Sequence, residues 1–164
     1  LKVDEEVEIK PGLKTEKGYK PIITKITNLI SGDLKVKELA PGGSSGIATS
    51  LDPSIVKADQ LTGNILGKVG KLPPVWEKLI LKTTLLKRIV GAKDDLVVDP
   101  IKKGEPLMLN VSSAVTIGVV TDIKKGKIQA NLKIPICAEK TDRVTISRRL
   151  GTRWRLIGYA EIEE

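Results

Sequence analysis

Hydrophobic and polar residues alternate in short runs along most of the chain, as they do in strands that bury one face. The runs are rich in β-branched residues, and the six clearest cover residues 7–10, 23–26, 79–82, 107–111, 127–132 and 143–147. Turn sequences separate them, at residues 11–12, 31–33, 41–43, 103–104 and 125–126. The spacing predicts an all-β chain built of barrels or sandwiches, because βαβ units would need helical segments between the strands.

The segment 83–90 leaves two interpretations open. Its apolar positions suit either a helical turn or a bulged strand followed by a loop, and they are Leu85, Leu86, Ile89 and Val90. No other part of the chain has a helical pattern.

Residues 153–162 alternate regularly enough to form one strand. In a regular strand the two faces take alternate residues. We therefore expect one set on the core face, namely Trp154, Leu156, Ala160 and Ile162. We expect the other set to project together away from the core, namely Arg153, Arg155, Tyr159 and Glu161.

The pair Pro73-Pro74 marks the best domain boundary, because proline donates no backbone hydrogen bond and holds the preceding residue in an extended conformation. The chain then divides into two all-β units, residues 1–73 and 74–164. The first unit opens directly on a strand pair, and we expect it to lack the strand that should precede that pair. We therefore expect this chain to be a piece of a longer protein.

The composition fits a folded protein without a membrane segment. The chain has 164 residues, of which 40% are hydrophobic, and that is enough for two small cores. No run approaches the roughly 18 apolar residues of a membrane span, and nothing resembles a signal peptide, so we expect a cytoplasmic protein with no membrane partner. Cys137 lies in an apolar run and is expected to be buried, and the absence of histidine argues against a zinc site.

Positive charge is concentrated in the second unit. Residues 1–73 carry eleven Lys and Arg against nine Asp and Glu, a net charge of +2, whereas residues 74–164 carry seventeen against eleven, a net charge of +6. Five of the six arginines lie close together in sequence, and we call them the arginine cluster: Arg143, Arg148, Arg149, Arg153 and Arg155. A guanidinium suits bidentate contacts with phosphate, so the cluster either contacts RNA or forms a salt-bridged strand surface. Only 2% of residues are aromatic, which leaves no platform for stacking single-stranded bases.

The chain lacks the residues on which most enzymes depend. Without histidine there is no imidazole base, and no serine lies in a nucleophile-elbow sequence. The segment 63–69 imitates a phosphate-binding loop, but three rather than four residues separate its glycines, and Val69 replaces the magnesium-binding hydroxyl. The segment 56–59 lacks the asparagine of a guanine-binding motif. We predict no catalytic residue, no metal site and no cofactor within this chain.

Five motifs occur in the order in which a known family has them. The longest spans residues 41–63, and the others are residues 8–12, 85–91, 105–113, and 147–149 with 154–160. Through these motifs the chain resembles the gamma subunit family of archaeal and eukaryotic translation initiation factor 2, over nearly its whole length. Ser44 and Ser45 depart from the family, whose members more often have bulkier apolar residues after the glycines.

The resemblance implies a fold of two consecutive antiparallel β-barrels of the translation-factor type. It places the GTPase domain, with its GTP and magnesium, outside this chain, so that the chain itself is not an enzyme. It further implies a role in delivering initiator methionyl-tRNA to the small ribosomal subunit, together with the alpha and beta subunits of the same factor.

Candidate site residues follow from the same resemblance. In such factors the 3′ end of the tRNA lies against the first barrel, where glycines let a nucleotide approach the backbone. The positions implied near the tRNA are Pro41, Gly42, Gly43, Gly46 and Thr49, and the alternative for this segment is a tight hairpin turn. The alpha subunit binds the first barrel, and a turn-rich loop at 11–21 would offer it Lys14, Lys17, Tyr19 and Lys20. For the arginine cluster the family adds packing against the GTPase domain as an alternative to RNA.

Two other classes of protein fit part of the pattern. A fragment of an elongation factor or a selenocysteine-specific factor would share the barrels, but should lack residues 51–53 and 154–158 in these contexts. A free-standing basic RNA-binding β-barrel protein would have no GTPase domain attached.

Overall fold

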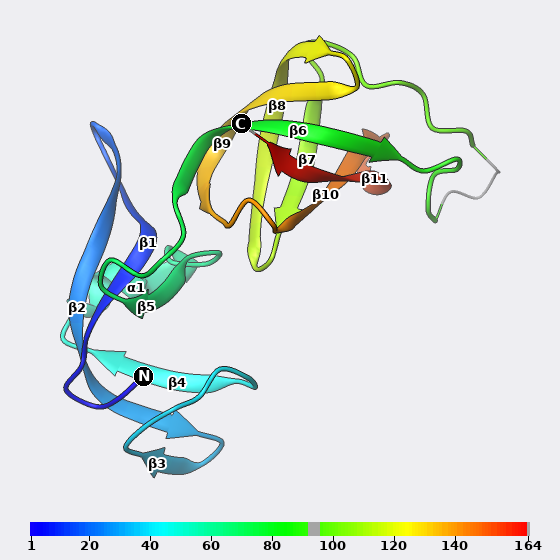
Figure 1. Cartoon of the computed structure of the whole chain (residues 1–164). Coiled ribbons are helices and arrows are strands. Elements are labelled where there is room, and N and C mark those ends of the chain that lie inside the picture. The colour runs from blue at the N-terminus through cyan, green and yellow to red at the C-terminus, as the bar shows by residue number, and fades with distance from the viewer. Residues whose placement is uncertain (92–95, 164) are drawn as a thin grey trace. The chain divides into compact units, whose positions relative to one another are not determined.

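The computed structural model describes residues 1–91 and 96–163, and it contains every strand that the alternating pattern predicts (Figure 1). The prediction of an all-β fold is therefore confirmed. The chain divides into two compact units, Leu1–Leu72 and Pro73–Glu164, and the division falls beside the proline pair. No helix in the described part of the chain is long and apolar enough to cross a membrane.

The first unit is an antiparallel sheet of five strands. These strands are β1 (Glu6–Thr15), β2 (Gly18–Ser31), β3 (Leu34–Val36), β4 (Ser45–Thr49) and β5 (Ile65–Lys68). A short helix α1 (Pro53–Val56) and a 3-10 turn (Lys57–Asp59) connect β4 to β5. The sheet order is β3-β2-β1-β5, and β4 pairs with β2 as well, because Leu29 of β2 has Val36 and Ile47 as its two partners.

Within the described residues, the antiparallel sheet of the first unit is open. β5 pairs only with β1, while β3 and β4 pair only with β2, so the outer strands of the sheet are not joined to each other. Its core is correspondingly small, with Val7, Ile26 and Leu29 fully buried.

The second unit is a closed barrel of six antiparallel strands (Figure 1). They are β6 (Val75–Leu85), β7 (Pro106–Val111), β8 (Ala114–Lys124), β9 (Lys127–Cys137), β10 (Arg143–Leu150) and β11 (Arg153–Glu163). Around the barrel their order is β10-β11-β6-β9-β8-β7, so every strand has two neighbours and no edge is left open. Leu79, Leu107 and Ile146 are among the fully buried side chains of its interior.

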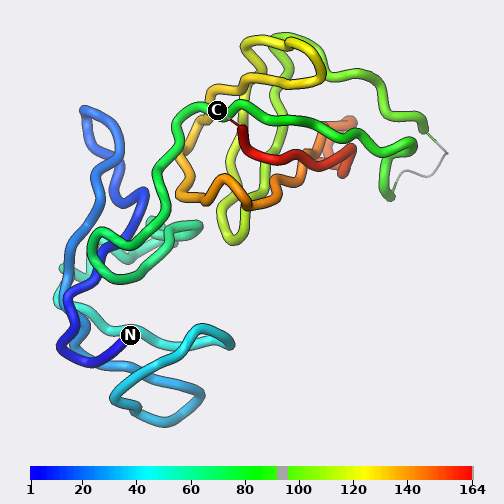
Figure 2. Tube along the Cα trace, in the orientation of Figure 1, coloured from blue at the N-terminus to red at the C-terminus, as the bar shows by residue number. Residues whose placement is uncertain are grey.

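Two local predictions concern residues at the ends of barrel strands. Cys137 is buried as expected, and its thiol lies 3.0 Å from the Pro73 carbonyl oxygen that accepts its hydrogen bond. In the ambiguous segment, β6 continues to Leu85 and the chain then runs on without forming a helix (Figure 2). The backbone N–H groups of Leu86 and Val90 still donate to the carbonyls of Ile157 and Leu156 in β11. There the backbone N–H of Ile89 donates to the carbonyl of Leu96 at 2.9 Å.

Strand β11 corrects the expected division of its residues between two faces. Opposite β11, Ile146 pairs with Gly158 and Ser147 pairs with Leu156, so Ile157 is an extra residue in a β-bulge. Ile157 is fully buried, and the regular alternation is lost on its N-terminal side, where Trp154, Arg155 and Leu156 are all partly buried. Ala160 and Ile162 face the core as predicted, but Trp154 and Leu156 are only partly buried and do not belong to the core cluster.

Candidate functional site

The hairpin of β1 and β2 carries the four residues implied as a contact for a partner subunit. Lys14 pairs with Tyr19 across the hairpin, and the Thr15 hydroxyl donates to the Gly18 carbonyl at 2.7 Å. The expected turn-rich loop at 11–21 is therefore wrong, because the two strands stay paired up to a two-residue turn. Lys14, Lys17 and Lys20 are exposed, which makes the tip a basic projection from the sheet.

Gly12 positions this hairpin. The backbone N–H of Gly12 donates to the Asn64 side-chain oxygen at 2.7 Å, and Gly12 has a φ of 90°. A Cβ at this position would lie 1.9 Å from the Lys20 carbonyl oxygen, so the two strands approach closely only because glycine stands here.

The glycine-rich segment implied near the tRNA end connects β3 to β4, which lie on opposite sides of β2. The alternative of a tight hairpin turn is therefore wrong. Gly42 and Gly43 have φ values of 124° and 69°, and a Cβ at either would meet no atom within 4 Å, so their backbone lies open. Gly46 lies within β4 against the side chain of Ile30. Pro41, Gly42, Gly43 and Gly46 thus form one exposed stretch, and Thr49 ends it with its hydroxyl accepting a 3.4 Å hydrogen bond from the Leu51 N–H.

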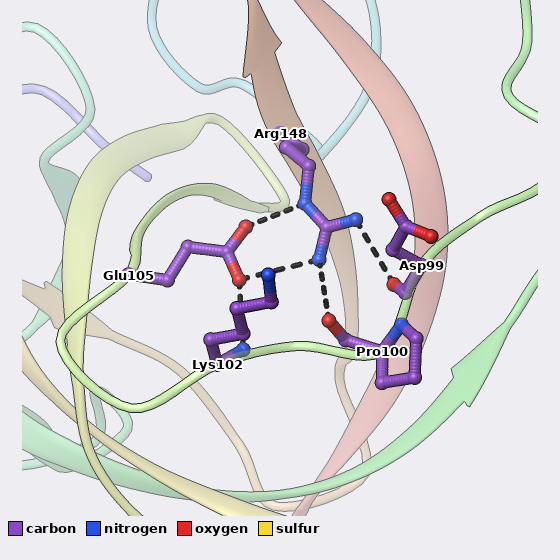
Figure 3. Close-up of polar contacts among 5 residues, drawn as sticks. All are labelled: Asp99, Pro100, Lys102, Glu105 and Arg148. Carbon is purple, nitrogen blue, oxygen red and sulfur yellow. Dashed lines mark hydrogen bonds and ion pairs between the residues drawn. The ribbon is translucent and has the colours of Figure 1, made fainter.

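Arg148 of the arginine cluster is engaged within the barrel (Figure 3). Its Nε lies 2.5 Å from one carboxylate oxygen of Glu105 and its Nη2 lies 3.2 Å from the other, so the pair is bidentate. The same guanidinium donates to the carbonyls of Asp99 and Pro100, at 2.9 and 3.2 Å. Arg148 therefore fastens the connection between β6 and β7 to strand β10.

Arg155 lies directly opposite Arg148 in the pairing of β10 with β11. A Cβ on Gly91 would lie 2.7 Å from Nη1 of Arg155, so this guanidinium packs on the backbone of the same β6–β7 connection. Two of the clustered arginines thus have structural contacts that the sequence pattern did not reveal.

The remaining clustered arginines are separated by the length of β10. Arg149 and Arg153 lie exposed at the β10–β11 turn, where Arg149 donates to the Gly151 carbonyl at 3.2 Å. Arg143 lies at the opposite end of β10, with its guanidinium 4.9 Å from the centre of the Tyr159 ring. The structure therefore does not bring the five arginines together as one surface.

Arg143 instead ends a row of charged residues on the outer face of the barrel. Across adjacent strands, the pairing register places Lys124 opposite Lys127, Lys127 opposite Lys82, Lys82 opposite Glu161, and Glu161 opposite Arg143. We call these five residues, all exposed, the basic row. Sequence reasoning missed it, and the only local signal was the lysine-rich turn at 124–127.

The charges beside this row influence one another. Lys124 forms an ion pair with Asp122 at 2.7 Å. The hydrogen bond from Lys124 lowers the pKa of the Asp122 carboxyl, and the same contact raises the pKa of the Lys124 ammonium. Both groups are therefore fully charged near neutral pH.

Metal chemistry has no cluster of ligands in the part of the chain that the structure describes. No group of three or more Asp, Glu, Cys or His side chains there is placed to hold a metal ion. The residues described above offer exposed cationic side chains and an open glycine backbone, and both features suit the binding of a partner molecule.

Sequence similarity to known proteins extends over both units. Residues 77–162 match the family model described as "Initiation factor eIF2 gamma, C terminal". The whole chain is 51% identical, over 168 aligned positions, to the translation initiation factor 2 subunit gamma of Pyrococcus horikoshii, of which it covers 41%. The corresponding proteins of Methanococcus maripaludis and Methanocaldococcus jannaschii are each 48% identical over 99% of the chain, which covers 40% and 41% of them. The chain thus spans about two fifths of the length of these relatives.

Proposed function

The chain belongs to the initiation factor 2 gamma family of translation initiation factors, and on that premise we propose that it supplies the tRNA- and subunit-binding surfaces of a longer GTPase. In this proposal the longer protein delivers initiator methionyl-tRNA to the small ribosomal subunit in the cytoplasm. GTP and magnesium are bound by its other part. The observation that carries the proposal is the 51% identity to an initiation factor subunit over the whole chain.

The glycine-rich segment is the proposed contact for the 3′ end of the tRNA. Gly42 and Gly43 leave their backbone open to approach by a ribose or a base, as a nucleotide contact requires. Filter binding of initiator methionyl-tRNA over a salt series tests this proposal. We expect weak binding that falls steeply with salt and hardly distinguishes charged from uncharged tRNA, because only one wall of the cleft is present. Tight binding that selects methionine would contradict it.

The hairpin tip is the proposed contact for the alpha subunit. The exposed lysines at the end of this paired hairpin suit an acidic partner surface. Charge reversal of Lys14 and Lys17 is expected to weaken capture of the alpha subunit. The matched control reverses Lys35, exposed on β3, and Lys37, exposed just after β3, in the same unit. If both variants lost equal amounts of alpha-subunit binding, the hairpin would not be part of the interface.

The arginine cluster is proposed to contact the GTPase domain or RNA through its exposed members. Arg149 and Arg153 are available for this, whereas Arg148 already has four partner atoms inside the barrel. The proposed contact surface is therefore smaller than one made of all five clustered arginines.

A further inference from the structure

The hairpin of β1 and β2 consists of two paired parts with a register shift between them. Pairing stops after Ile9 and Ile22, and it resumes at Leu13 and Lys20. β5 extends the sheet only beside the first of these parts, and the hairpin continues past it (Figure 1). We call residues 13–20 the outer hairpin. It carries the exposed lysines of the tip, and it projects beyond the strand that would support it from the side.

The register shift has a chemical cause on both strands. Pro11 and Pro21 stand between the two paired parts, and proline has no backbone N–H to donate to a facing strand. Gly12 has an N–H, but it donates to the Oδ1 atom of Asn64 at 2.7 Å. The ladder that would keep the outer hairpin in line with the sheet is thus interrupted where the two parts join.

Asn64 is itself attached to the sheet. Its Nδ2 atom and its backbone N–H both donate to the Leu61 carbonyl, each at 3.1 Å. The next residue, Ile65, begins β5 and pairs with Lys10 of β1. The Asn64 side chain therefore links the base of the outer hairpin to the sheet through β5.

The link between Gly12 and Asn64 is removed from solvent. Gly12 is buried and Asn64 is half-buried. A buried backbone N–H that loses its acceptor is strongly disfavoured, so without Asn64 the backbone at Gly12 must shift to reach water. Gly12 also lies against the Lys20 carbonyl, where an added Cβ would come within 1.9 Å of the oxygen. A shift at Gly12 therefore moves both strands of the outer hairpin together.

We propose that Asn64 is a positioning residue, whose side chain sets the direction in which the outer hairpin presents its lysines to a partner. The inference rests on the contact with the alpha subunit that is proposed above for this hairpin. A strand rises about 3.3 Å per residue, so the turn lies roughly 13 Å beyond Gly12. A small rotation at Gly12 thus displaces Lys14 and Lys17 considerably, and the affinity for an acidic surface falls although no cation is removed.

The test compares variants of the 164-residue chain with the parent. Asn64→Ala and Asn64→Leu both remove the acceptor, the first by shortening the side chain and the second at similar size. Asn64→Asp keeps an acceptor for the Gly12 N–H. Thr62→Ala is the control, because Thr62 is an exposed residue of the same turn. Thermal unfolding checks that all variants fold.

Residual dipolar couplings of the backbone amides measure the direction of the outer hairpin relative to the sheet. In Asn64→Ala and Asn64→Leu, the couplings of the outer hairpin should fit one another but no longer fit the orientation of residues 6–9 and 22–25. The Gly12 amide should exchange with solvent about tenfold faster. Asn64→Asp and Thr62→Ala should keep the couplings of the parent. A lower unfolding temperature with an unchanged direction would overturn the proposal, because it would leave Asn64 only a stabilising role.

Capture of the alpha subunit separates this inference from the proposed function. We expect Asn64→Ala to bind the alpha subunit about tenfold more weakly than the parent, and Asn64→Asp to recover most of that loss. Equal binding by Asn64→Ala and the parent would contradict the positioning role. If instead the parent failed to bind, or charge reversal of Lys14 and Lys17 had no effect, the proposed subunit contact would be wrong. The dipolar couplings would still decide whether Asn64 directs the outer hairpin.

Discussion

The Arg148 guanidinium and the Glu105 carboxylate form a bidentate pair that joins strand β10 to the start of β7. Both side chains are largely removed from solvent, with 13% and 16% of their surface exposed. The carbonyls of Asp99 and Pro100 complete the coordination of the guanidinium (Figure 3).

Removing Arg148 should therefore destabilise the barrel. Arg148→Ala leaves Glu105 charged and without its partner, and we expect a loss of about 2–4 kcal/mol in the free energy of unfolding, measured by urea titration. Arg149→Ala, one residue away and exposed, should cost less than about 0.5 kcal/mol. Equal costs at the two positions would show that the pair contributes nothing beyond a surface contact.

Gly12 is expected to be irreplaceable in the first unit. Gly12→Ala places a Cβ 1.9 Å from the Lys20 carbonyl oxygen in a backbone with φ of 90°, so strands β1 and β2 must separate. We expect a loss of at least about 2 kcal/mol in stability. Gly18→Ala is the control, because its φ is also positive but no atom lies within 4 Å of the added Cβ, and it should cost about 1 kcal/mol. Chemical denaturation of the two variants compares them directly.

The bulge in β11 predicts which of two neighbouring residues supports the core. Ile157 is fully buried, so Ile157→Ala should cost about 2–5 kcal/mol in unfolding free energy. Leu156→Ala should cost less than half as much, because Leu156 is only partly buried and does not belong to the core cluster. If β11 were a regular strand, Leu156→Ala would cost more than Ile157→Ala. The ranking of the two melting temperatures therefore distinguishes the bulged register from a regular one.

The ion pair of Asp122 with Lys124 predicts a pH dependence. The hydrogen bond from Lys124 lowers the pKa of Asp122 below its ordinary value of 3.8. The stabilisation is therefore present above the unfolded pKa and is lost as the pH falls through the lower folded pKa. In NMR titrations of side-chain carboxyl carbons, Lys124→Met should raise the midpoint for Asp122 towards 3.8. Asp52 serves as the internal control, because the Ser54 backbone N–H lowers its pKa and the substitution does not touch it.

The alternating pattern was sufficient to predict seven of the eleven strands that the structure describes and much of the core, but it did not single out β3, β4, β5 or β8. Val144 and Ile146 are buried as their spacing within 143–147 requires, because alternation is a local property of an extended chain. The same reasoning failed across Ile157, since an extra residue in one strand is recognised only once its partner strand is known. It also grouped five arginines by sequence distance, although Arg143 and Arg148 have different surroundings.

By itself, the amino-acid sequence determined the all-β class, the boundary signal at the proline pair and the family resemblance, because each is written in short stretches of consecutive residues. The tertiary structure alone decided that the first unit is an open sheet, that Arg148 is bound by Glu105, and that Lys82, Lys124 and Lys127 lie in one row. The physical reason is strand register. Which side chains meet across a sheet depends on how two distant segments pair, and neither segment contains that information alone.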